Sequence, residues 1–160
     1  MIAAALLLAL QSPARAPNLS VFKPFIGACW RTEFTATMHD THCFEAMFGG
    51  AHVLDRHEVK EGDKTVYAGE TVYSADGPDL VFTYFNSLGG MGIGKVGSAD
   101  RMLGFTGTMR ASPDKAEQPI DSEWRLIDVD HYEVRSLVPT TEGKAAKPHV
   151  FTKLAPTHPQ

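Results

Sequence analysis

Apolar and polar residues alternate along most of this chain. In the run from 27 to 35, Trp30 and Phe34 share one face, whereas Arg31 and Glu33 share the other. Successive side chains of a β-strand point to opposite faces, so this period of two predicts strands.

Turn signals rich in glycine, aspartate and serine recur about every ten residues, among them Gly49-Gly50 and the stretch Ser87-Leu88-Gly89-Gly90. Between them lie short runs rich in Val, Tyr, Phe and Thr, which favour strands. The predicted strands are 27–35, 41–48, 51–59, 65–74, 79–86, 91–97, 101–110, 120–127, 131–138 and 147–154. Consecutive hairpins that close on themselves leave no exposed edge. We therefore expect an all-β fold, a single up-and-down antiparallel β-barrel of about ten strands.

The two cysteines lie in the first predicted hairpin. A turn near Ala36 places Cys29 opposite Cys43, and opposed residues of an antiparallel pair lie about 4.5–5.5 Å apart, within reach of a disulfide. Such a bridge would stabilise the fold by about 3 kcal/mol. The alternative is two reduced cysteines, which a register slip of two residues would leave unbridged.

Chaining simple hairpin registers predicts which side chains share the barrel interior. A two-residue turn at Gly49-Gly50 pairs His42 with His57 and Phe44 with Asp55, and the next turn pairs Asp55 with Glu70. The same face collects apolar residues, and we interpret it as the interior. These residues are Trp30, Phe34, Phe44, Val72, Val81, Thr83, Phe85, Gly92, Gly94, Leu103, Phe105 and Met109.

Four aromatic residues fall on the opposite, outer face in this register: Tyr67, Tyr73, Phe82 and Tyr84. Exposed aromatic patches mark interaction surfaces. They indicate either a homodimer surface or a β-bulge, because one extra residue reverses the faces of everything beyond it.

The predicted interior contains four ionisable groups, His42, Asp55, His57 and Glu70, among apolar walls. Ligand pockets combine apolar surface with a few convergent polar groups. We therefore predict an interior binding site for a small apolar or amphipathic molecule. Its apolar lining is Trp30, Phe34, Phe44, Phe85 and Phe105. Two alternatives stay open: a closed internal network or solvent-facing side chains, and a zinc or iron site.

The first residues are typical of a targeting segment. An apolar run from Ile2 to Leu10 is too short to span a bilayer, and Ala14 and Ala16 form an Ala-x-Ala cleavage pattern. We expect a signal peptide over residues 1–16, a barrel domain over 17–155 and a flexible tail over 156–160. Export to the periplasm or outside the cell agrees with a disulfide.

Composition excludes some partners and chemistries. The 160 residues carry a formal net charge of −4, and no basic stripe marks a nucleic-acid surface. The chain has no span long enough to cross a membrane as a helix. The glycine-rich run ending at Lys95 is followed by Val96, where a phosphate-binding loop requires Ser or Thr. No serine-nucleophile elbow or catalytic cysteine context is present, and we assign no catalytic residue, metal or cofactor.

Several motifs resemble a known family. A first strand with Gly27 and Trp30, followed by a meander of this length, is similar to the calycins, which are the lipocalin, fatty-acid-binding and nitrobindin barrels. The pieces THCFE, FGG, DRH and YAGETVYSADG resemble a family of exported bacterial lipocalin-like barrels of unassigned activity. The resemblance implies the barrel fold and assigns no activity. From the interior residues we expect binding of a small molecule without catalysis. The alternative is a metal- or haem-dependent enzyme that uses the His/Asp/Glu cluster inside the barrel. His149 parallels the haem-ligating histidine of nitrobindins, but an exposed histidine on the last strand explains it better.

Overall fold

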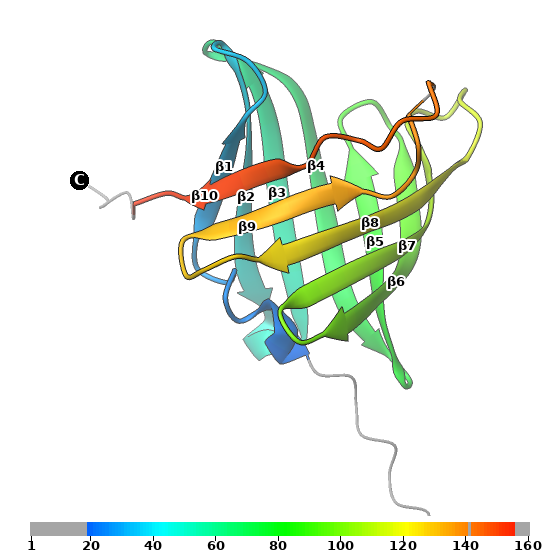
Figure 1. Ribbon diagram of the computed structural model, residues 1–160. Coiled ribbons are helices and arrows are strands. Elements are labelled where there is room, and N and C mark those ends of the chain that lie inside the picture. Colours follow the sequence, from blue (N-terminus) through cyan, green and yellow to red (C-terminus); the bar gives the residue numbers. More distant parts are fainter. Residues whose placement is uncertain (1–18, 141, 156–160) are drawn as a thin grey trace, which may run out of the picture.

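Ten antiparallel strands form a closed barrel in the computed structural model, which describes residues 19–140 and 142–155 (Figure 1). Two short 3-10 turns accompany them. The elements are η1 (Leu19–Phe22), β1 (Cys29–Glu33), β2 (Met38–Met47), η2 (Phe48–Gly50), β3 (His52–Glu61), β4 (Lys64–Asp76), β5 (Asp79–Asn86), β6 (Met91–Ala99), β7 (Met102–Arg110), β8 (Gln118–Leu126), β9 (His131–Ser136) and β10 (His149–Lys153). The predicted signal peptide and C-terminal tail lie outside the described residues.

The barrel follows an up-and-down topology. Each strand pairs with the next strand in the chain, and β1 closes the circle against β10 through the pair Trp30 and Lys153. The predicted all-β barrel and its ten strands are therefore confirmed. None of the helical turns in the described part of the chain is long and apolar enough to span a membrane.

Aromatic side chains from η1 and the loop after it close one end of the barrel. Phe22 is fully buried and stacks on Tyr73, with 4.3 Å between the ring centroids. Phe25 packs edge-on against Tyr132 and contacts Trp30 and Phe44. This end of the interior is therefore a packed aromatic core.

The first two hairpins have the predicted register. Phe44 pairs with Asp55 and His42 pairs with His57. Cys29 pairs with Cys43, and the two form a disulfide, so the predicted bridge is confirmed. The cross-link joins β1 to β2 on the outer face of the barrel, because the alternate residue Trp30 is buried inside.

The third hairpin differs from the prediction. Val59 pairs with Tyr67 but Lys60 pairs with Thr65, so Val66 is an extra residue on β4. This bulge pairs Asp55 with Thr71 rather than with Glu70. A shift of one residue turns every later side chain of β4 to the other face.

The four aromatic residues expected outside therefore lie inside. Tyr73 and Phe82 are buried core residues, and Tyr67 and Tyr84 are partly buried. The bulge alternative is confirmed, and the aromatic surface that suggested a homodimer does not lie on the outer face. Four residues expected inside lie on the outer face of β4 and β5 instead: Val72, Val81, Thr83 and Phe85.

The connection between β5 and β6 restores the predicted faces. The predicted strands pair Asn86 with Met91 across a four-residue turn. In the structure Phe85 pairs with Met91, so five residues lie between the paired positions. The side chain of Asn86 accepts hydrogen bonds from the backbone N–H groups of Leu88 and Gly90, which holds this longer turn. Leu103 and Phe105 consequently face inward, as the sequence predicted.

Candidate functional site

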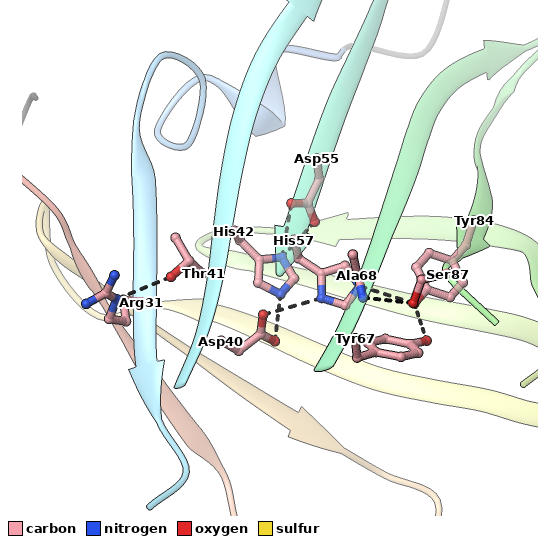
Figure 2. A network of polar contacts seen from close by, with 10 residues as sticks. All are labelled: Arg31, Asp40, Thr41, His42, Asp55, His57, Tyr67, Ala68, Tyr84 and Ser87. Atoms are coloured by element: carbon pink, nitrogen blue, oxygen red, sulfur yellow. Dashed lines mark hydrogen bonds and ion pairs between the residues drawn. The ribbon is translucent and has the colours of Figure 1, made fainter. Parts of the chain in front are cut away.

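A chain of hydrogen-bonded polar side chains crosses the inner wall formed by β2, β3, β4 and β5 (Figure 2). It lies beyond the aromatic core, on the side away from η2. In order, its members are Asp55, His42, Asp40, His57, Tyr84 and Tyr67.

His42 lies between two carboxylates. Its Nδ1 is 2.8 Å from Oδ2 and 3.0 Å from Oδ1 of Asp55, and its Nε2 is 3.2 Å from Oδ2 of Asp40. Ionised carboxylates only accept hydrogen bonds, so both ring nitrogens donate and the ring is an imidazolium. Asp55 is 1% exposed, which places this ion pair in the barrel interior.

Charge and hydrogen bonding decide the ionisation of this pair. Burial alone would lower the pKa of His42, but the negative charge of Asp55 and hydrogen bonds to Asp40 and Asp55 raise it to about 10. Burial alone would raise the pKa of Asp40, but hydrogen bonds from His42 and His57 hold it well below its usual value of 3.8. At neutral pH, His42 is therefore protonated and Asp40 is ionised.

His57 connects the ion pair to two tyrosines. Its Nδ1 lies 3.3 Å from Oδ1 of Asp40, and its Nε2 lies 3.1 Å from the Tyr84 hydroxyl. The Tyr84 hydroxyl in turn lies 2.5 Å from the hydroxyl of Tyr67, so the two tyrosines are hydrogen-bonded to each other. Burial and the Tyr67 hydrogen bond raise the pKa of Tyr84, so its hydroxyl stays protonated.

A glycine makes room for the contact between His57 and Tyr84. A Cβ atom on Gly69 would lie 2.5 Å from His57 Nε2 and 2.6 Å from the Tyr84 hydroxyl oxygen. Gly69 pairs directly with His57 across β3 and β4, so the two share the interior face. The close approach of the two polar side chains requires glycine at this position.

The structure brings together six of the nine residues predicted to bind a ligand. His42, Asp55 and His57 belong to the polar chain, and Trp30, Phe44 and Phe105 are buried in the aromatic core.

The inward positions predicted for two of the other three, Glu70 and Phe85, are wrong. Glu70 lies on the outer face, where it pairs with Arg56 at 3.0 Å and its side chain is 55% exposed. Phe85 is 50% exposed for the same reason, the bulge in β4. Phe34 lies just past the end of β1 and is 40% exposed, packing edge-on against His149.

Sequence reasoning missed three members of the polar chain: Asp40, Tyr67 and Tyr84. The predicted second strand began at Thr41, whereas β2 begins at Met38. One further step of the alternation would have placed Asp40 on the face of His42. The two tyrosines were assigned to the outside because the bulge at Val66 has no signal in a simple alternation.

Two buried polar atoms among the described residues have no hydrogen-bond partner: Trp30 Nε1 and the Tyr132 hydroxyl oxygen. Their rings lie 5.2 Å apart, edge to face, in the aromatic core. Buried polar groups are normally hydrogen-bonded, and these two atoms are not. Both can therefore still form a hydrogen bond.

One group of side chains has the composition of a metal site. One ligand atom each from Asp40, His42 and His57 lies within 4.8 Å of the other two. Two imidazoles and one carboxylate form a donor set that suits zinc or iron(II).

The sequence matches no protein-family model, and no curated protein matches it significantly.

Proposed function

We propose that this protein binds a small amphipathic molecule inside its barrel and does not transform it. The observation that carries the proposal is the asymmetry of the interior beyond the aromatic core. The polar chain occupies the wall formed by β2 to β5, and the inward-facing Ile120 of β8 and Val134 of β9 are apolar and only partly buried. Ser122 and Ser136 also face inward on β8 and β9, so this second wall is mixed and less polar than the first. Two walls of different polarity suit a molecule with both characters.

The arrangement of the histidines favours binding over acid–base chemistry. Both ring nitrogens of His42 and both of His57 have hydrogen-bond partners within the chain of side chains. A general base must lie within hydrogen-bond reach of the substrate proton, and these four nitrogens are each bonded to a protein group. The half-buried tyrosine hydroxyls at the end of the chain are instead suited to orient a polar group of a ligand.

Native mass spectrometry tests this proposal on protein purified from its own host. We expect an additional mass of one small organic molecule, which an organic solvent extracts. Replacing both tyrosines by phenylalanine (Tyr67→Phe with Tyr84→Phe) removes the two hydroxyls and should lower the occupied fraction several-fold. Arg110→Ala, on the exposed outer face of β7, is the matched control and should leave it unchanged.

Two results would contradict the proposal. One is a wild-type protein that carries no small molecule from its host. The other is a tyrosine double variant that retains the molecule at the wild-type occupancy, because the polar chain would then have no part in recognition.

We also propose that the protein is exported to the periplasm or beyond the cell. The disulfide between Cys29 and Cys43 supports this, because such bonds persist in oxidising compartments. The apolar N-terminal run and its Ala-x-Ala pattern point the same way. Fractionation of the host followed by intact-mass measurement should find a chain that lacks about sixteen N-terminal residues. An uncleaved chain with two free thiols in the cytosol would contradict export.

A further inference from the structure

Three side chains on two adjacent strands converge on one point of the interior. Asp40 and His42 are alternate residues of β2, and His57 pairs with His42 across β3. The two imidazole rings stack with 4.8 Å between centroids and 23° between planes. Each ring therefore presents one nitrogen to the same carboxylate (Figure 2).

The separations between these atoms match those of metal ligands. Zinc lies about 2.0–2.2 Å from histidine nitrogen and carboxylate oxygen, so two corners of its tetrahedron are about 3.3–3.6 Å apart. Asp40 Oδ2 is 3.2 Å from His42 Nε2, and Asp40 Oδ1 is 3.3 Å from His57 Nδ1. Both contacts are at the long limit of hydrogen bonds of the N–H···O type. All three ligand atoms lie within 4.8 Å of one another, so an ion can bridge them once the side chains draw together from that limit to about 3.3–3.6 Å.

The other nitrogen of each histidine is already held in the way that metal-binding histidines require. Asp55 accepts from Nδ1 of His42 with both carboxylate oxygens, and the Tyr84 hydroxyl accepts from Nε2 of His57 in the tautomer whose Nδ1 is free to bind a metal. A metal-ligating histidine almost always has its second nitrogen bonded to a carboxylate, carbonyl or water, which orients the ring. The first contact is a carboxylate–histidine pair directed at the proposed ion.

The charge of the cluster also fits a divalent cation. Asp40 and Asp55 are buried, at 7% and 1% exposure, and carry two negative charges when both are ionised. With both imidazoles in the neutral form that binds metals, the cluster has a charge of −2. A dication balances that charge without a further protein group.

We infer that Asp40, His42 and His57 bind a divalent first-row transition metal, with zinc and iron(II) the best-suited ions. The ligand atoms are an Oδ of Asp40, Nε2 of His42 and Nδ1 of His57. Asp55 and Tyr84 position the two rings. The protein supplies three ligands, so at least one coordination position is left for water or for another donor. The site uses three members of the polar chain, and its formation does not require that an organic molecule be bound.

Cobalt(II) and zinc(II) are the probes for the test. The protein is made without a polyhistidine tag, treated with EDTA and transferred to metal-free buffer. We expect one equivalent of Co2+ to bind and to produce ligand-field absorption in the visible region typical of four- or five-coordinate cobalt. One equivalent of Zn2+ should abolish that absorption by displacing the cobalt.

Three variants separate the proposed ligands from their surroundings. Asp40→Asn and His57→Gln keep the side-chain size and should each weaken Zn2+ binding by about 100-fold or more, measured by competition with a chelator. Asp55→Asn should weaken it about 10- to 100-fold, as expected for a group that orients a ligand. His131→Gln is the matched control, because His131 also pairs with an aspartate, Asp128, but on the exposed surface. It should bind zinc like the wild type.

A measurement on the wild-type protein covers variants that do not fold. In NMR spectra of the imidazole nitrogens, Zn2+ should shift Nε2 of His42 and Nδ1 of His57 and leave His131 unchanged. The inference is overturned by any of three results. The first is a wild-type protein that binds neither Co2+ nor Zn2+ at millimolar concentration. The second is zinc that shifts surface histidines alone. The third is wild-type zinc affinity in folded Asp40→Asn and His57→Gln.

Discussion

The ring of His42 is the centre of a buried cluster of three charged side chains. Asp55 and Asp40 bind its two nitrogens, and the second oxygen of Asp40 continues to His57. Removing one partner of a buried pair leaves an uncompensated charge and costs far more than the pair contributes. The individual members of this cluster are therefore sensitive to substitution and to pH.

The free energy of unfolding of the metal-free protein should depend on pH through this pair. The pKa of His42 rises on folding from 6.5 to about 10, so its contribution is complete below pH 6.5 and is lost as the pH approaches 10. The pKa of Asp40 falls on folding, so its contribution is present above pH 3.8 and is lost as the pH decreases. The free energy of unfolding should therefore be highest between pH 3.8 and pH 6.5. Urea denaturation in the presence of EDTA measures it.

Two observations check the assignment of this pH dependence. NMR of the His42 ring should show both nitrogens protonated at about pH 8, above the usual pKa of histidine. His131→Gln, which alters an exposed pair with Asp128, should retain the pH profile. A neutral His42 ring at that pH would contradict the predicted ionisation.

Inner and outer ionisable residues of neighbouring strands should differ in their effect on stability. His57→Ala removes a partner of both Asp40 and Tyr84 and should lower the free energy of unfolding by about 1–3 kcal/mol. Glu70→Ala breaks a pair with Arg56 in which both side chains are more than half exposed, and should cost about 0–1 kcal/mol. Chemical denaturation measures both, and equal losses would contradict the observed faces of β3 and β4.

At the scale of elements, β4 determines what the polar wall contains. The bulge at Val66 turns Tyr67, Gly69, Thr71 and Tyr73 inward. Without the bulge, Glu70 would share the interior with Asp55. The extra residue therefore places Thr71 opposite Asp55 and Gly69 opposite His57, and keeps a second carboxylate out of the interior.

A single methyl group on β4 should disturb the polar chain. Gly69→Ala places a Cβ 2.5 Å from His57 Nε2, so the bond between His57 and Tyr84 must break, at a cost of about 1–3 kcal/mol. Gly104→Ala, on β7, meets no atom within 4 Å and should leave stability unchanged within about 0.5 kcal/mol. Urea denaturation compares the two, and a Gly69→Ala variant as stable as wild type would show that the wall tolerates the change.

The whole molecule is a barrel closed by contacts between the two ends of its described chain. β1 pairs with β10, and the backbone N–H of Leu154 donates to the carbonyl of Cys29. The disulfide holds β1 against β2 at the same place. The closing strand pair is therefore reinforced covalently on one side.

Reduction of the disulfide should weaken this closure. The bond joins residues 14 apart, and the chain-entropy model gives about 3 kcal/mol for a loop of this size. Urea denaturation with and without a thiol reductant measures the loss. The variant with both Cys29→Ser and Cys43→Ser should be less stable than the oxidised protein and insensitive to the reductant. Equal stability of the oxidised and reduced wild type would contradict a stabilising role.

The sequence by itself determined the strands, the barrel and the disulfide. Strand alternation and turn residues are local properties, so ten strands could be predicted without knowledge of their neighbours. The register of the hairpin closed by Gly49 and Gly50 also followed from its short turn, and it brought His42 next to His57. Half of the polar chain could be predicted for this reason.

Only the tertiary structure decided which residues complete the site. The bulge at Val66 and the longer connection after Phe85 each move the register by one residue, and neither interrupts the alternation. Their two shifts cancel from β6 onward, which is why Phe105 on β7 was placed correctly and Glu70 on β4 was not. Whether a side chain is buried depends on the pairing of strands around the whole barrel, and alternation within one strand does not specify that pairing.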